Sequence, residues 1–221
     1  MNTRLNSSNG HLIVVTLLIA MSGCATTQPQ GRAPATGDQV ASPSPAVPSV
    51  GTDVACIYPE LREHLLHMME LDQARRKALP ANGPAQEQVE ALAYIDACNT
   101  KRMKQIVRDY GWPTRSLVGD DGSHAAWLLV QHADQDPVFQ SRCLDLMHAE
   151  LTVGEVFPQD VAYLTDRVLV HQNQPQLYGT QFHQVDGKMV PQPIQDPLTV
   201  DAHRAEVGLS NMADYKKLMK T

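Results

Sequence analysis

The sequence predicts a mainly α-helical fold, a helical bundle of about five to six helices with a small β-hairpin near the C-terminus. Apolar residues recur at helical spacing in successive segments from Cys56 onward, and glycine or proline separates these segments. Near the C-terminus this period is lost, and Asp186-Gly187 lies between two short apolar stretches. An Asp-Gly pair in such a position is typical of a hairpin turn.

Residues 1–23 are expected to be a signal peptide that does not belong to the fold. Arg4 precedes the apolar run Leu12–Met21, which would span only about 15 Å as a helix, half of a bilayer core. The following Met21-Ser22-Gly23-Cys24 resembles the bacterial lipobox, with Met21 where leucine is usual. The resemblance implies cleavage before Cys24 and acylation of its thiol and new amino group. An ordinary secreted protein is the alternative.

Residues 24–53 are expected to form a lipidated and disordered tether. Five prolines stand among Ala, Ser, Thr, Gly and Gln, with few large apolar side chains to offset the entropy of ordering. Residue 25 is Ala and not Asp, which by resemblance to the enterobacterial sorting rule favours the outer membrane, with the protein on its periplasmic face. Residues 54–221 are then predicted to be a single helical globular domain.

The charge of the chain excludes one class of partner. The formal net charge is −6, and removal of residues 1–23 deletes Arg4 and no acidic residue, which changes it to −7. A sequence-independent nucleic-acid binder needs a basic surface, and an acidic domain gains nothing from an anionic membrane. The predicted membrane contact is therefore the lipid on Cys24, and no nucleic acid is expected as a partner.

Five helices are predicted before the hairpin. Leu61, Leu65 and Met68 form one helical stripe, and Gly111-Trp112-Pro113 ends the second helix. The run Ala125–Val130 is apolar on all sides, which indicates a buried third helix. The predicted ranges are 59–79, 84–110, 123–133, 136–151 and 158–171.

The remaining segments predict a loop, two strands and a divided last helix. Residues 118–123 are expected to be a loop whose Ser123 caps the third helix. Residues 176–182 and 188–190 are predicted to be strands. The last helix is expected to start at Thr199, to stop at Gly208 and to resume near residue 211.

Three cysteines remain after Cys24, namely Cys56, Cys98 and Cys143. In an oxidising compartment they allow one disulfide with three possible pairings. Their apolar surroundings favour buried thiols equally, and both alternatives stay open. Their spacing matches no Cys-x-x-Cys pair and no metal-type cluster, and no cofactor is predicted.

Polar side chains fall on the apolar faces of several predicted helices. Asp72 continues the stripe of the first helix, and Asp96 lies in the apolar row of the second. A buried polar group without a partner costs about 1–3 kcal/mol, so these side chains are expected to meet in one internal cluster. Such a cluster beside a cleft would be the natural candidate for a binding or catalytic site.

The motifs around these residues resemble a widespread bacterial domain of unknown function. The resemblance covers roughly residues 56–218 and implies a shared pocket, but it supplies no reaction. The matching stretches are Asp72-Gln73 with Arg76, Gly111-Trp112-Pro113-Thr114, Gln131-His132-Ala133-Asp134, Tyr163-Leu164-Thr165-Asp166-Arg167, Gln176-Leu177-Tyr178-Gly179-Thr180-Gln181 and Arg204-Ala205-Glu206-Val207-Gly208-Leu209.

His132 is the strongest candidate for proton transfer or ligand contact, because imidazole titrates near neutral pH. Asp134 or Asp166 is expected to orient it. The alternative is a helix-terminal histidine that only bonds to backbone carbonyls.

Asp166 and Arg167 form a second candidate pair, which would clamp a carboxylate or phosphate of a ligand. The favoured alternative is an internal ion pair with Asp72, Asp96 or Arg76.

Two further sets of residues have patterns that a binding site could use. On a strand, Gln176, Tyr178 and Thr180 would share one face for a polar ligand such as a sugar or peptide, although a hairpin braced by side-chain hydrogen bonds has the same pattern. His64 and His67 share a helix face, but no third ligand is signalled, so surface positions are expected and no metal is predicted.

The sequence predicts an envelope lipoprotein with a buried polar pocket. This pocket either only binds a small polar envelope ligand or also hydrolyses it. The alternative is an inhibitor or immunity lipoprotein that neutralises a cell-wall-targeting protein toxin through exposed loops such as residues 118–123. His132 and Asp166 are the candidate catalytic residues. The candidate ligand-binding residues are Asp72, Gln73, Arg76, Gln131, Asp134, Arg167, Gln176, Tyr178 and Gln181.

Overall fold

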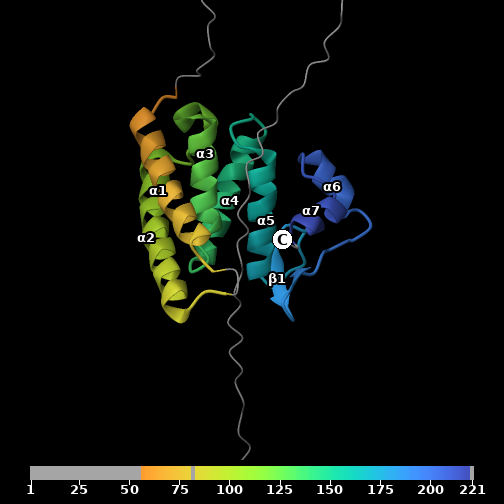
Figure 1. Ribbon diagram of the computed structural model, residues 1–221. Coiled ribbons are helices and arrows are strands. Elements are labelled where there is room, and N and C mark those ends of the chain that lie inside the picture. The colour runs from red at the N-terminus through yellow and green to blue at the C-terminus, as the bar shows by residue number, and fades with distance from the viewer. Residues whose placement is uncertain (1–55, 81–82, 220–221) are drawn as a thin grey trace, which may run out of the picture. The chain divides into compact units, whose positions relative to one another are not determined.

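The computed structural model describes residues 56–80 and 83–219. The signal peptide, Cys24 and most of the tether lie outside these residues. Within them the chain forms seven helices and one two-stranded antiparallel sheet, so the prediction of a mainly α-helical fold with a C-terminal hairpin is confirmed (Figure 1).

The first five helices form the bundle. They are α1 (Pro59–Lys77), α2 (Gln86–Tyr110), α3 (Arg115–Gln131), α4 (Pro137–Leu151) and α5 (Pro158–His171). Helix α1 packs along α3, and α4 packs along α5 (Figure 1). The predicted starts and ends of these helices are right to within two residues, except for the start of α3.

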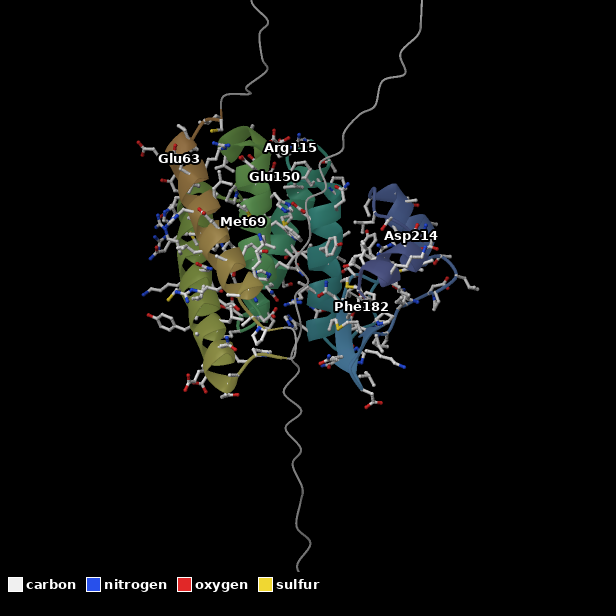
Figure 2. All side chains as sticks on the ribbon, in the orientation of Figure 1. Glu63, Met69, Arg115, Glu150, Phe182 and Asp214 are labelled. Atoms are coloured by element: carbon white, nitrogen blue, oxygen red, sulfur yellow. The ribbon has the colours of Figure 1, made fainter. Side chains whose placement is uncertain are left out.

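The apolar stripe of α1 is buried as its spacing predicts. Leu61, Leu65 and Met68 pack into the core, and Asp72 follows them in the same buried row. Met69 lies beside this row and packs against the core from its edge (Figure 2). A carboxylate therefore occupies an interior position at the C-terminal end of α1.

The predicted loop at residues 118–123 is wrong over most of its length, because helical structure already begins at Arg115. Gly119, with a φ of 75° and a ψ of 169°, is non-helical and separates two helical segments within α3. Ser123 is buried inside the helix and does not cap its start. Asp120 pairs with Arg115 and Asp121 pairs with Arg62 of α1, so the acidic residues that suggested a loop form surface ion pairs.

The strand predicted at 176–182 is also wrong over most of its length. Only Phe182 belongs to β1 (Phe182–Val185), and Gln176 forms a single parallel bridge with Ile194. Gly179 has a φ of 68°, and a Cβ atom there would lie 2.6 Å from the Met212 sulfur. The chain therefore turns at Gly179, where a strand would have to run straight.

The hairpin and the divided last helix are confirmed. Strand β1 pairs with β2 (Lys188–Pro191), and Asp186 and Gly187 between them both have positive φ, as a tight hairpin turn requires. Helices α6 (Val200–Glu206) and α7 (Met212–Leu218) follow. Asn211 caps α7 by accepting a hydrogen bond from the Asp214 amide.

A chain of aromatic rings connects the bundle with the C-terminal elements. Trp127 of α3 contacts Tyr163 of α5 edge-on, Tyr163 contacts Tyr215 of α7, and Tyr215 contacts Phe182. Figure 2 labels Phe182 beside the hairpin. These contacts fix the hairpin and α7 against α5.

The three cysteines of the described chain are free thiols, and only Cys143 is buried. Cys98 is exposed on α2, so the expectation of apolar surroundings for all three was wrong. Within residues 56–80 and 83–219, no helix is both long and apolar enough to cross a bilayer.

Candidate functional site

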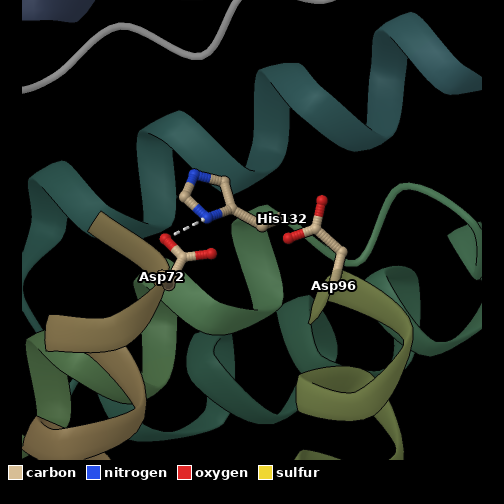
Figure 3. A group of neighbouring side chains, drawn as sticks. All are labelled: Asp72, Asp96 and His132. Carbon is tan, nitrogen blue, oxygen red and sulfur yellow. Dashed lines mark ion pairs between the residues drawn. The ribbon is translucent and has the colours of Figure 1, made fainter. Parts of the chain in front are cut away.

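His132 lies at the C-terminal end of α3, where it points toward the end of α1. Its Nδ1 atom lies 2.9 Å from Oδ2 of Asp72 (Figure 3). The predicted orienting residues, Asp134 and Asp166, do not fill this role. Asp72 reaches the histidine because its helical row places it inside the bundle, whereas Asp134 and Asp166 are bound elsewhere.

Asp72 is held by two residues of its own helix. Gln73 donates a hydrogen bond of 2.9 Å to Oδ2, and Arg76 donates to both carboxylate oxygens at 3.2–3.3 Å. The same guanidinium forms an ion pair with Asp96 of α2. Arg76 therefore links the two carboxylates, and the structure brings α1, α2 and α3 together at one polar cluster around His132, which we call the His132 cluster. Its members are Asp72, Gln73, Arg76, Asp96 and His132.

The protonation states in the His132 cluster follow from burial and charge. Burial alone would raise the pKa of Asp72, but His132 and Arg76 outweigh it and lower this pKa from 3.8 to about 2. Burial, helped by the nearby Arg76, lowers the pKa of His132 below 6.5 although Asp72 acts in the opposite direction. Burial also raises the pKa of Asp96 to about 6, against the effect of Arg76. At neutral pH the cluster thus contains an anionic Asp72 beside a neutral imidazole.

One ring nitrogen of His132 has no partner. Both nitrogens are buried, and Nδ1 faces the Asp72 carboxylate as an ion pair, whereas Nε2 has no hydrogen-bond partner in the described part of the chain. The Oε1 atom of the preceding Gln131 is buried without a partner in the same way. Buried side-chain polar atoms are nearly always paired, so consecutive exceptions at the end of α3 require a reason.

Exposure increases from the centre of the cluster toward its edge. The side chains of Asp72 and His132 are 0% and 2% exposed, those of Arg76 and Asp96 are 12% and 17% exposed, and that of Asp134 is 36% exposed. Arg76 and Asp96 are therefore the members of the cluster nearest to solvent, and the adjoining Asp134 is more exposed still.

Asp134 and Arg167 form the neighbouring ion pair. Arg167 donates from Nε and Nη2 to the two carboxylate oxygens of Asp134, and from Nη1 to Oε1 of Gln181 at 3.0 Å. Arg167 is thus an internal ion-pair residue, as the favoured alternative proposed, but its partner is none of the three predicted. Gln140 of α4 donates from its amide nitrogen to Asp134, and its Oε1 atom accepts a hydrogen bond from Nδ1 of His171.

Asp166 lies on another side of α5 and has a different environment. Its carboxylate accepts hydrogen bonds of 2.7–3.0 Å from the amides of Leu177, Tyr178 and Thr180 and from the Thr180 hydroxyl. Consecutive residues on a helix point about 100° apart, so Asp166 and Arg167 do not act together on one ligand. Asp166 organises the turn around Gly179.

Gln176 and Tyr178 also belong to this turn. The Gln176 side chain donates to the carbonyl groups of Gln181 and Gln192 and accepts from the Gln181 amide. The Tyr178 carbonyl accepts from Arg204, which is fully buried. The structure therefore divides the predicted site: Asp72, Gln73, Arg76, Gln131 and His132 lie together, Asp134, Arg167 and Gln181 adjoin them, and Asp166, Gln176 and Tyr178 brace a turn.

The motifs that contribute these side chains extend through nearly the whole folded chain. The sequence pattern of one family matches residues 59–221. The chain belongs to this family, the family of unknown function DUF6624. No curated protein and no solved structure shows significant similarity to it. The cluster of this DUF6624 domain must therefore be interpreted from its own chemistry.

Several polar residues of the DUF6624 domain belong to the observed hydrogen-bond and ion-pair network, although the sequence analysis does not predict them as site residues. Asp96 lay on an apolar row in the sequence, which was a usable signal, but it was not included among the candidate ligand-binding residues. Gln140, His171 and Arg204 gave no comparable signal, because each meets its partners only after distant segments pack together. His64 accepts a hydrogen bond from Arg102 at the surface, and His67 is exposed.

Proposed function

We propose that this DUF6624 protein is a lipid-anchored envelope lipoprotein whose helical domain binds a small polar ligand at the His132 cluster. The observation that carries the proposal is the buried imidazole of His132, whose Nε2 atom has no hydrogen-bond partner although the ring lies among charged groups. A ligand that bonds to a nitrogen of this ring would satisfy an atom that costs about 1–3 kcal/mol when left unpaired.

The charged neighbours of His132 favour binding over a purely structural role. Asp72, Arg76 and Asp96 form ion pairs with one another, so these three groups are already connected without the histidine. If the cluster served only to hold the helices together, an apolar residue at position 132 would fill the space without an unsatisfied atom. A bound ligand that pairs with the imidazole therefore best explains a histidine at this buried position.

The class of ligand follows from the groups that line its approach. Carboxylates at Asp96 and Asp134 and the amide of Gln131 suit hydroxyl, amine and amide groups, as found in sugars and short peptides. Soluble fragments of peptidoglycan carry all of these groups and occur in the proposed compartment. Hydrolysis of the bound ligand would require His132 to act as the base for a water molecule.

Binding is tested with the detergent-solubilised full chain and a mixture of soluble muropeptides as the probe. We expect a ligand-dependent change in the imidazole ¹⁵N resonances of His132, and loss of binding in His132→Gln. The exposed His148 supplies the control variant His148→Gln, which should bind like the wild type. Wild-type protein that shows no binding, or a His132→Gln variant that binds normally, would refute the pocket.

The same samples test two further points. Mass spectrometry of the muropeptides shows whether the protein only binds or also hydrolyses them. A Cys24→Ser variant should leave the membrane fraction if the lipid is the anchor. Recovery of one stoichiometric protein partner in place of muropeptides would favour the toxin-inhibitor alternative, although the helical segment 118–123 no longer supplies an exposed contact loop.

A further inference from the structure

Three potential metal ligands converge in the His132 cluster. Asp72 comes from the end of α1, Asp96 from the middle of α2 and His132 from the end of α3 (Figure 3). One ligand atom of each residue lies within 4.8 Å of the other two. Three helices of the bundle thus place one nitrogen and two carboxylate oxygens around a common point.

The state of His132 is a second and independent observation. Its side chain is 2% exposed, and its Nδ1 atom faces Oδ2 of Asp72 at 2.9 Å as an ion pair. Two ligands of a tetrahedral ion, each about 2.0–2.2 Å from it, lie roughly 3.3–3.6 Å apart, so a small movement of either side chain would place a cation between them. A buried imidazole nitrogen that faces a carboxylate oxygen is therefore an arrangement that a shared cation would explain.

We propose that Asp72, Asp96 and His132 form a binding site for a divalent transition metal, with Zn²⁺ as the best match. One imidazole and two carboxylates suit Zn²⁺ and its first-row neighbours, whereas Ca²⁺ and Mg²⁺ prefer oxygen ligands alone. Three protein ligands leave a fourth tetrahedral position open for water or for a group of the bound ligand. The inference deepens the proposed function, on which it rests for the role of this cluster in binding.

Arg76 competes with a metal ion for the carboxylates of Asp72 and Asp96. Its guanidinium bonds to both carboxylates and supplies positive charge between them. A carboxylate has about four lone-pair positions, so one oxygen can accept from Arg76 while another binds the metal. Arginine then takes the outer position that orients a ligating carboxylate. Asp72 and Asp96 together still carry one more negative charge than Arg76 balances, and this excess favours a cation.

The metal site is tested with Zn²⁺ alone, without any organic ligand. The full chain is treated with a chelator, freed of the chelator and titrated with Zn²⁺ by calorimetry near neutral pH. We expect one Zn²⁺ per chain and a higher melting temperature in the metal-bound form. The affinity should fall in Asp96→Asn and His132→Gln by more than the about 10–100-fold that loss of an outer-shell partner costs, and His148→Gln should bind normally.

Two measurements keep the test decisive if a variant folds poorly. Replacement of Zn²⁺ by Co²⁺ in the wild-type protein should produce the intense visible absorption of a four-coordinate site. Arg76→Gln removes the competing charge and should bind Zn²⁺ at least as tightly as the wild type. Absence of a one-to-one titration, absence of the Co²⁺ spectrum, or binding unchanged in both His132→Gln and Asp96→Asn would overturn the metal site.

The two proposals fail in different ways. Muropeptide binding to chelator-treated protein without any Zn²⁺ titration would eliminate the metal and leave the ligand pocket intact. Zn²⁺ binding by wild-type protein that ignores muropeptides would support the metal and contradict the proposed ligand.

Discussion

Oδ2 of Asp72 lies 2.9 Å from Nδ1 of His132, and this contact joins the C-terminal ends of α1 and α3. Both side chains are buried, so their proximity is a property of the interior and not of a flexible surface. Arg76 extends the contact to α2 through Asp96. Asp72 and Arg76 of α1 therefore connect this helix with α3 and α2, and the consequences can be measured.

The first prediction concerns Asp72→Asn. The neutral amide keeps the shape of the side chain but loses the charge that Arg76 and His132 face, so the free energy of unfolding should fall by about 1–3 kcal/mol. Urea denaturation in the presence of a chelator measures this. Asp109→Asn changes an exposed ion pair with Arg108 and should cost less than about 0.5 kcal/mol. Equal losses in both variants would mean that Asp72 has no special structural role.

Asp166→Asn should loosen the turn around Gly179 and leave the His132 cluster unchanged. The Asp166 carboxylate accepts three backbone amides, and an amide group in its place can accept fewer of them. Hydrogen exchange at Leu177, Tyr178 and Thr180 should accelerate by about tenfold or more, whereas α1 should exchange as before. Unchanged protection of these three amides would contradict the assigned role.

Gly179→Ala and Gly154→Ala form a matched pair. Both glycines have positive φ, so each alanine adds backbone strain of about 1 kcal/mol. At position 179 the new Cβ would also lie 2.6 Å from the Met212 sulfur, while nothing lies within 4 Å at position 154. Thermal unfolding should show a loss about 1–3 kcal/mol greater for Gly179→Ala, through overpacking. A loss of the same size at both sites would show that Met212 moves aside freely.

Thiol alkylation should distinguish two cysteines of the folded protein. Burial raises the pKa of the Cys143 thiol to about 12, so it carries almost no reactive thiolate at mildly alkaline pH. Cys98 is exposed on α2 and should react first. Peptide mass spectrometry after brief iodoacetamide treatment measures both sites. Rapid labelling of Cys143 in native protein would contradict the packing of α4.

The pair His124–Asp160 predicts a pH dependence of stability. Burial lowers the pKa of His124, but Asp160, at 3.0 Å, outweighs it and raises this pKa above 6.5. A raised histidine pKa means that its contribution is fully present below 6.5 and disappears as the pH rises through the folded value. The stability difference between wild type and His124→Gln should therefore shrink from about pH 6 to about pH 9.

Chemical denaturation at several pH values checks this difference. Burial also raises the pKa of Asp160, which acts in the opposite sense at lower pH, so the comparison starts near pH 6. A difference between the two proteins that grows with pH would contradict the assigned direction.

Local signals were sufficient for most of the fold. Pro137 and Pro158 start α4 and α5, and Asp186-Gly187 forms the hairpin turn, because each acts within one or two residues. The failures have a common cause. Gly119 and Gly179 have similar positive φ, yet helix continues on both sides of Gly119, whereas the chain around Gly179 forms no strand. The neighbours of the two glycines come from distant segments: a Cβ atom would meet Arg62 of α1 at Gly119 and Met212 of α7 at Gly179.

The sequence by itself determined that polar groups had to be buried and paired, because Asp72 and Asp96 occupy positions on apolar helix faces where an unpaired charge is intolerable. It also determined the helices and their limits, since periodicity and caps are local. Only the tertiary structure decided which partners meet, because helix packing alone brings Asp72 to His132 and Arg167 to Asp134. The same packing left the Nε2 atom of His132 without a hydrogen-bond partner in the described part of the chain.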